Sequence, residues 1–221
     1  TSPFLIFSYE VNIGFGLLCS HATIPTEKKN RRHGVMQHIV WEIKYLSPPL
    51  VWRYCKKCKE KKEFLCSGQF RVNAQRKTLD VWLIYKCSDC ETTWNAALYS
   101  RVCTQSLDPA LLEAFHTNSP ALAEHYAMDC SLLQKNGAEI TLPPYLVLGM
   151  DFLPDETVTL TIKSEYDIPI KVSSIVRKKL HISQWDYLQR IADGRICSIP
   201  ERDLRHCKLH REITLLFQTG L

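Results

Sequence analysis

The chain has 221 residues, of which 45% are hydrophobic and 23% are charged, and these proportions are ordinary for a folded globular protein. It contains no run of 18 apolar residues, which argues against a membrane-spanning helix. Ten cysteines are too sparse for a small secreted disulfide scaffold. We therefore expect a cytoplasmic protein with one metal site and several buried thiols.

The net charge of +5 is unevenly distributed along the chain. Residues 51–94 contain ten Lys and Arg against five Asp and Glu, and residues 161–221 contain eleven against seven. Residues 95–160, between them, contain two against eight. Alternating blocks of this kind indicate modules with different surfaces.

Residues 1–35 are interpreted as an extension of doubtful origin. The apolar stretch 3–22 is interrupted by Glu10 and Asn12 and lacks the basic region that opens a signal peptide. The first methionine is Met36, and a coherent strand-like pattern follows it. The alternative is a native N-terminal strand that pairs with the rest of the chain.

The next segment, residues 36–100, is predicted to be a small antiparallel zinc ribbon. Residues 40–46 are predicted to form a strand, and "SPP" at 47–49 a turn before a second short strand. "EFLCSGQFRV" and "DVWLIYKC" are rich in aromatic and β-branched residues and are separated by the polar "NAQRKT", which predicts a hairpin.

Two Cys-x-x-Cys pairs flank this hairpin, with 28 residues between them. Each pair can aim two thiolates at one point, and Zn²⁺ prefers four such ligands in a closed tetrahedron. Four protein ligands leave no open position, so the metal is predicted to be structural. Redox-active pairs, unligated thiols and an iron–sulfur centre are the alternatives. The predicted ligands are Cys55, Cys58, Cys87 and Cys90.

Residues 101–156 are predicted to be a helical segment. Asp108 precedes Pro109, and Ser119 precedes Pro120, which is the pattern of an N-cap followed by proline in the first helical turn. Gly137 is placed to end the second helix. Because this segment is acidic, it is the predicted docking surface if the protein is an adaptor.

Residues 157–221 are predicted to be a small αα-ββ module that follows a strand at 157–164. Val172, Ile175, Val176 and Leu180 share one helical face, and a second helix is predicted between Ser183 and Gly194. "RICSI" and "REITLLF" read as two short strands. The complete chain is therefore predicted to have an α+β fold, with an N-terminal zinc ribbon, a helical middle and this C-terminal module.

The other cysteine and histidine residues that could bind a metal are interpreted mainly as structural. Cys66 lies in a predicted strand and is interpreted as a core residue, and His206-Cys207-x-x-His210 is a less favoured second metal site. The sequence has no glycine-rich phosphate loop, no Gly-x-Ser-x-Gly and no His-Glu-x-x-His motif, so we expect no enzymatic activity and no small-molecule substrate. The ribbon's aromatic residues can either fill its core or stack on bases, and its lysines can either contact phosphates or form a solvated face.

The stretch "CSGQFRVNAQRKTLDVWLIYKCSDCETTWN" resembles the bacterial domain-of-unknown-function family 1062. Its members are similar in having a Cys-x-x-Cys, then "FxCSGxFRVNA", "LDVWLIYKC" and a second Cys-x-x-Cys followed by "TWN". The resemblance covers about 36–221 and is strongest over 51–95. It implies a bacterial cytoplasmic protein with a zinc ribbon, and it assigns no activity.

The C-terminal stretch "IKVSSIVRKKLHISQWDYLQRIADGRI" is similar to the small RNA-binding domain first seen in the fourth protein of the small ribosomal subunit. Leu180, Ile182, Ser183, Ile191, Gly194 and Ile196 occupy that domain's pattern positions. Gln184-Trp185 and "SIPER" depart from it, where a basic residue and an "N-G" turn are usual. The resemblance implies RNA contacts through Lys171, Arg177, Lys178, Lys179, Arg190 and Arg195.

These patterns lead to one functional hypothesis and one alternative. The hypothesis is a non-enzymatic zinc protein that binds nucleic acid, with RNA preferred, through the basic surfaces of the ribbon and the C-terminal module. The alternative is a zinc-stabilised adaptor that binds a protein partner. Neither requires a membrane.

Overall fold

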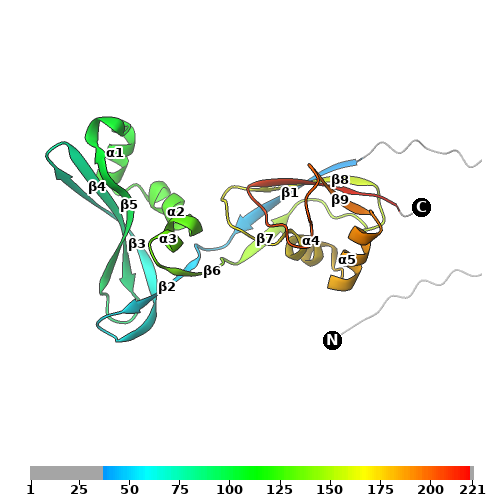
Figure 1. Ribbon diagram of the computed structural model, residues 1–221, viewed down its shortest axis with the longest axis horizontal. Coiled ribbons are helices and arrows are strands. Elements are labelled where there is room, and N and C mark those ends of the chain that lie inside the picture. Colours follow the sequence, from blue (N-terminus) through cyan, green and yellow to red (C-terminus); the bar gives the residue numbers. More distant parts are fainter. Residues whose placement is uncertain (1–36, 220–221) are drawn as a thin grey trace, which may run out of the picture. The chain divides into compact units, whose positions relative to one another are not determined.

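The computed structural model describes residues 37–219, and the predicted extension 1–35 lies outside them. The described residues form two five-stranded sheets with helices packed on each (Figure 1). One sheet has the strand order β5-β4-β3-β2-β6, and the other has the order β7-β1-β8-β10-β9. No helix among the described residues is long and apolar enough to cross a membrane.

The first sheet carries the cysteine pairs, and all of its strand pairings are antiparallel. β4 has the strict alternation that builds a half-buried strand, because Leu79, Val81, Leu83, Tyr85 and Cys87 all face the core. The predicted hairpin between the cysteine pairs is confirmed as β3 and β4. The strands are β2 (Leu50–Cys55), β3 (Glu60–Gln75), β4 (Thr78–Cys87), β5 (Thr93–Cys103) and β6 (Glu139–Thr141).

Three short helices pack on this first sheet. They are α1 (Pro109–His116), α2 (Pro120–Ala127) and α3 (Cys130–Lys135), and a 3₁₀ turn at Thr104–Ser106 precedes them. The side chains of Asp108, Ser119 and Asp129 accept hydrogen bonds from the backbone N–H groups of the first turns, as N-caps do. The predicted caps at Asp108 and Ser119 are therefore confirmed.

Asn136, directly after α3, joins that helix to the edge strand β5. Its Oδ1 accepts from the backbone N–H of Ala97 at 2.8 Å, and its Nδ2 donates to the carbonyl oxygen of Ala97 at 3.0 Å. The side-chain amide thus mimics one residue of a neighbouring strand. This contact fixes α3 beside the first sheet.

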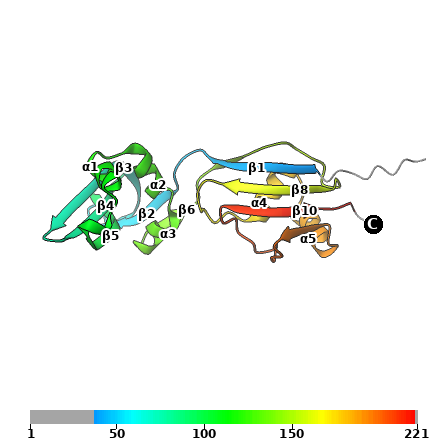
Figure 2. The ribbon, with the colours of Figure 1, turned by 90° about the horizontal axis from the view of Figure 1, so that it is seen from above.

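The second sheet combines strands from both ends of the described chain. β1 (Gln37–Tyr45) pairs in parallel with β8 (Val158–Ser164) and antiparallel with β7 (Tyr145–Leu148). Figure 2 shows β1, β8 and β10 (Glu212–Phe217) side by side. β9 (Ile196–Ile199) completes the sheet, and α4 (Val172–Leu180) and α5 (Gln184–Ala192) cover one of its faces.

The predicted layout of a small ribbon, a helical middle and a small αα-ββ module is wrong. The described residues are mostly sheet, with 43% in strands and 23% in helices. The strand predicted to lead into the ribbon is β1, and it lies in the other sheet between β7 and β8. Its alternation of buried Ile39, Trp41 and Ile43 marks a strand, but the pattern contains no information on which distant strand it pairs with.

Candidate metal centre

Two matched turns position the four cysteines. One turn joins β2 to β3 and holds Cys55 and Cys58, and the other joins β4 to β5 and holds Cys87 and Cys90. In the first, the backbone N–H of Lys59 donates to the carbonyl oxygen of Cys55 at 2.8 Å. In the second, Glu91 donates to Cys87 at 3.0 Å. The antiparallel strands bring both turns to the same end of the sheet, so the thiols of both pairs meet.

The four sulfur atoms form one compact cluster, which we call the four-cysteine centre. The Sγ atoms of Cys55 and Cys90 are 3.4 Å apart, those of Cys58 and Cys87 are 3.9 Å apart, and all four lie within 4.8 Å of one another. A tetrahedral Zn²⁺ with Zn–S bonds of about 2.3 Å requires sulfurs about 3.8 Å apart. The spacing is too long for disulfides, and the four thiols are free. The centre could hold a metal ion, as the sequence predicted.

The surroundings of Cys90 favour its thiolate form. Its Sγ lies 3.2 Å from Thr92 Oγ1, and contacts with the hydroxyl and the backbone of Thr92 lower the pKa of Cys90 to about 6. The neighbouring sulfurs, that of Cys90 first, raise the pKa of Cys58. Without metal, Cys90 therefore favours the thiolate and Cys58 favours the protonated thiol. Binding of a metal cation would displace the protons that remain on the thiols. The sequence analysis missed Thr92, whose signal is a hydroxyl two residues after a cysteine ligand.

An ion pair joins the two turns across the outside of the centre. Lys62 Nζ lies 2.7 Å from Asp89 Oδ2 in the second turn and 2.9 Å from Glu60 Oε1 at the end of the first. The hydrogen bond from Lys62 lowers the pKa of Asp89. In contrast, Lys56, Lys57 and Lys59 are exposed and form no ion pair with any residue between 37 and 219.

A hollow of about 330 Å³ opens beside the centre, between β2 and the start of β5. Arg53 lies over the Trp94 ring, with its guanidinium carbon 4.2 Å from the ring centroid, and its Nη1 donates to the carbonyl oxygen of Asn136 at 2.5 Å. Tyr54 is 64% exposed. The lining residues are Arg53, Tyr54, Cys55, Lys56, Phe64, Thr92, Thr93, Trp94 and Asn95.

Five of the six C-terminal cations that the sequence placed in an RNA contact have partners within the chain. Arg177 donates to Gln184 Oε1, Lys178 donates to the carbonyl oxygen of Tyr145, and Lys179 pairs with Asp151 at 2.6 Å. Arg190 and Arg195 both pair with Asp155, at 2.7 and 3.5 Å.

The Arg177 contact joins α4 to α5, and the other four join the C-terminal module to β7 and to residues 149–156. The sixth cation, Lys171, is exposed at the N-cap of α4. Five of these six cations therefore help to hold the C-terminal module together and to the segment before it.

The remaining candidates do not assemble into a second site. His206 Nδ1 lies 3.0 Å from Asp203 and His210 Nδ1 lies 3.0 Å from Asp167, so the two imidazoles contact different carboxylates. Within residues 37–219 the four cysteines are the only group close enough to bind a metal. Cys66 is half-buried and lies opposite Tyr85 in the sheet, as expected for a strand residue.

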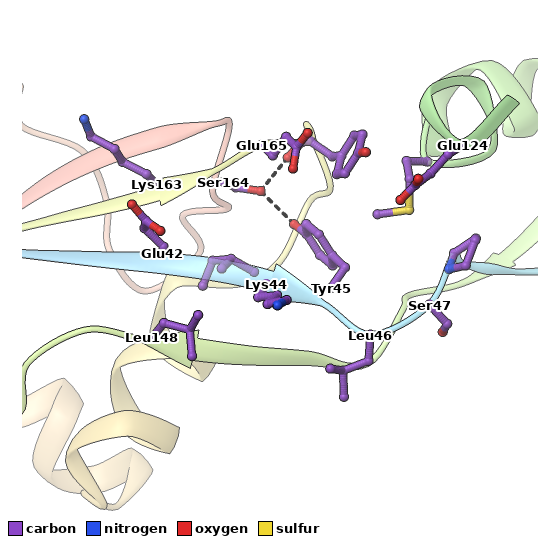
Figure 3. Close-up of a pocket in the computed structure, with 14 residues that line it drawn as sticks. Glu42, Lys44, Tyr45, Leu46, Ser47, Glu124, Leu148, Lys163, Ser164 and Glu165 are labelled. Carbon is purple, nitrogen blue, oxygen red and sulfur yellow. Dashed lines mark hydrogen bonds between the residues drawn. The ribbon is translucent and has the colours of Figure 1, made fainter. Parts of the chain in front are cut away.

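A larger cavity of about 800 Å³ lies where β1 and β8 end, beside α2 (Figure 3). The Tyr45 hydroxyl is 2.8 Å from Ser164 Oγ, and Ser164 Oγ donates to the carbonyl oxygen of Tyr166 at 2.6 Å. Because a serine hydroxyl has one proton, Tyr45 is the donor in the first bond. The Ser164 hydroxyl is thus committed to structural hydrogen bonds.

A comparison with family models places the chain in a family of unknown function. A family model described as "Protein of unknown function (DUF1062)" matches residues 72–202, which is more than half of the chain. The match includes the second cysteine pair and begins after the first. No curated protein and no solved structure matches the chain.

Proposed function

We propose that this chain, which belongs to the DUF1062 family, is a non-enzymatic cytoplasmic protein that binds one structural Zn²⁺ and uses the ribbon around it to bind RNA. The zinc assignment is supported by the donor set: four thiolates in a closed arrangement suit Zn²⁺ and leave no position open for a substrate. The hydrogen-bonded Ser164 hydroxyl in the cavity of about 800 Å³ supports the non-enzymatic assignment.

The observation that carries the RNA assignment is the contrast between two sets of cations. Lys56, Lys57 and Lys59 are exposed without ion-pair partners in the described chain. In the C-terminal set, Lys179, Arg190 and Arg195 form ion pairs, and Arg177 and Lys178 donate to neutral oxygen atoms. Free lysines release counterions when they neutralise phosphates, and paired cations must first give up a partner. The proposed RNA contact therefore lies on the ribbon.

A competing role for these three lysines is to offset the charge of the metal centre, since four thiolates around Zn²⁺ carry a net charge of about −2. The two roles separate experimentally. If the lysines only offset charge, replacing them weakens zinc binding. If they contact phosphate, replacing them weakens RNA binding while one zinc per chain remains.

The test measures binding of a fluorescent stem–loop RNA of mixed sequence between about 50 and 300 mM salt. The combined variant Lys56→Gln, Lys57→Gln, Lys59→Gln should bind more weakly. The negative slope of log affinity against log salt should become shallower by about 2. The matched control is Arg177→Gln with Lys178→Gln, which should leave the slope unchanged. Absence of binding by the unmodified protein at the lowest salt concentration removes the RNA assignment.

A second candidate function is favoured by an exposed apolar edge. β7 is the outer strand of its sheet, and Leu146 and Leu148 on it are exposed, as is the nearby Met150. An adaptor could bind a protein segment there by strand addition. Leu148→Asp should abolish capture of such a partner and leave RNA binding intact.

A further inference from the structure

The hollow beside the four-cysteine centre combines planar and cationic groups without any acid. Phe64 and Trp94 contribute aromatic surface, Arg53 and Lys56 contribute positive charge, and no Asp or Glu is among the residues that line it. Its volume of about 330 Å³ lies at the lower end of the range of small-molecule sites, which is about 300–1,000 Å³. A ligand that fits is therefore small, flat and attached to negative charge.

Arg53 is held in a fixed orientation inside this hollow. The Trp94 ring supports its guanidinium at 4.2 Å, and the carbonyl oxygen of Asn136 accepts from one of its nitrogens. Trp94 is in turn packed against Tyr85 and Phe64, with ring centroids 5.2 and 6.4 Å away. A guanidinium has five N–H donors, so most of those of Arg53 remain for a ligand. A planar cation supported in this way is a stacking surface for a nucleobase.

We propose that this hollow binds one unpaired base of single-stranded RNA, stacked against the Arg53 guanidinium, with an adjacent phosphate at Lys56. This inference rests on the proposed RNA-binding function and specifies its substrate as an unpaired strand. A base inside a duplex cannot enter the hollow without being unstacked from its neighbours. The ribbon should therefore discriminate against fully paired RNA, although both forms carry phosphates.

The metal centre and the hollow share a wall, because Cys55 contributes to both. Cys55 also ends β2, the strand that carries Arg53 and Tyr54. Base binding is consequently expected to require the metal-loaded protein. Removal of the metal should reduce binding of single-stranded RNA more than binding of a duplex, which uses the lysines alone.

The experiment compares a fluorescent single-stranded RNA of about ten nucleotides with the matching duplex, using the zinc-loaded full chain. The single strand should bind about tenfold more tightly than the duplex. Arg53→Lys should remove most of this preference and leave the salt slope unchanged, because the planar stacking surface is lost while the positive charge stays. The substitution keeps a cation beside the Trp94 ring, so it preserves the fold.

The matched control is Arg177→Lys, which makes the same exchange at a guanidinium on α4, outside the hollow. It should leave both affinities unchanged. A photoreactive uridine in the single strand should cross-link to the peptide containing Tyr54 or to that containing Trp94.

Equal affinity for single strand and duplex, or an Arg53→Lys variant that keeps the full preference, overturns this inference and leaves the salt-dependent RNA binding in place. Cross-links confined to α4 and α5 overturn it equally. If neither RNA binds at the lowest salt concentration, the proposed function itself has failed.

Discussion

Lys59 and Glu91 occupy equivalent positions in the two cysteine turns, and both adopt the left-handed backbone conformation, with φ values of 59° and 58°. Each directly follows the second cysteine of its pair, and each donates its backbone N–H to the carbonyl oxygen of the first cysteine. The two halves of the four-cysteine centre are therefore built by the same turn, although their side chains differ in charge. The turn geometry is set by the backbone and by the thiols.

This equivalence predicts how the turns respond to substitution. Lys59→Val and Glu91→Val should each lower the free energy of unfolding by about 1–2 kcal/mol, because a β-branched residue is strained in the left-handed region. Lys59→Gly should be tolerated, since glycine adopts this conformation freely. Urea denaturation measures the effect. The control Lys57→Val lies in the same turn without a positive φ, and an equal loss there would contradict the explanation.

Metal removal should unfold the first sheet, which carries the four-cysteine centre, before the second sheet. The centre lies between the turns that align β2 to β5, whereas the core of the second sheet is a separate cluster around Trp41, Ile162 and Tyr187. Hydrogen exchange of the chelated protein should show lost protection in β2–β5 and retained protection in β8 and β10. Cys90→Ser should have the same effect without a chelator.

The control for this prediction is Cys103→Ser, which replaces an exposed cysteine outside the centre. It should bind one metal ion per chain, as the unmodified protein should, when the metal content is measured by mass spectrometry. Full protection of β2–β5 after complete metal removal would show that the centre is not structural.

The backbone at Gly149 passes so close to β1 that only glycine fits there. Its φ is +128°, and a Cβ atom there would lie 2.4 Å from the carbonyl oxygen of Val40 and 2.6 Å from Trp41 Cδ1. Gly149→Ala should therefore lower the free energy of unfolding by about 3 kcal/mol, through strain and overpacking together. Gly194→Ala is the matched control. Gly194 also has a positive φ, but a Cβ atom there would meet open space within 4 Å, so only the smaller conformational strain should appear.

Asp155 should make the free energy of unfolding depend on pH in the acid range. Arg190, through a hydrogen bond and its charge, lowers the pKa of Asp155 in the folded chain. A carboxyl group whose pKa is lower in the folded state stabilises the fold above its unfolded pKa of about 3.9, and this stabilisation is lost as the pH falls through the folded pKa. Asp155→Asn should thus be less stable at neutral pH and lose less stability on acidification.

Urea midpoints between about pH 7 and pH 2 measure this dependence. The exposed neighbour Glu156 forms no ion pair within residues 37–219, so Glu156→Gln should follow the unmodified protein at every pH. If Asp155→Asn shows the same acid sensitivity as the unmodified protein, the pairing with Arg190 contributes nothing to stability.

Local patterns in the sequence were sufficient for several features of this protein. The spacing of the four cysteines identified the centre, because two short turns and one hairpin bring the thiols together with few long-range contacts. Asp108 and Ser119 marked helix starts, since an N-cap bonds only to its own helix. These features depend on residues that are close in the sequence or joined by a single hairpin.

Only the tertiary structure decided the partner of β1, the engagement of the C-terminal cations and the existence of the hollow. β1 pairs with a strand more than 100 residues away, and Arg190 meets Asp155 across 35 residues. The hollow requires Arg53 on β2 to reach Trp94 on β5, although β3 and β4 separate these strands in the sheet. The alternation of apolar and polar residues along a strand is compatible with many distant partner strands. Such contacts are therefore decided by how the sheets pair and curve in the folded chain.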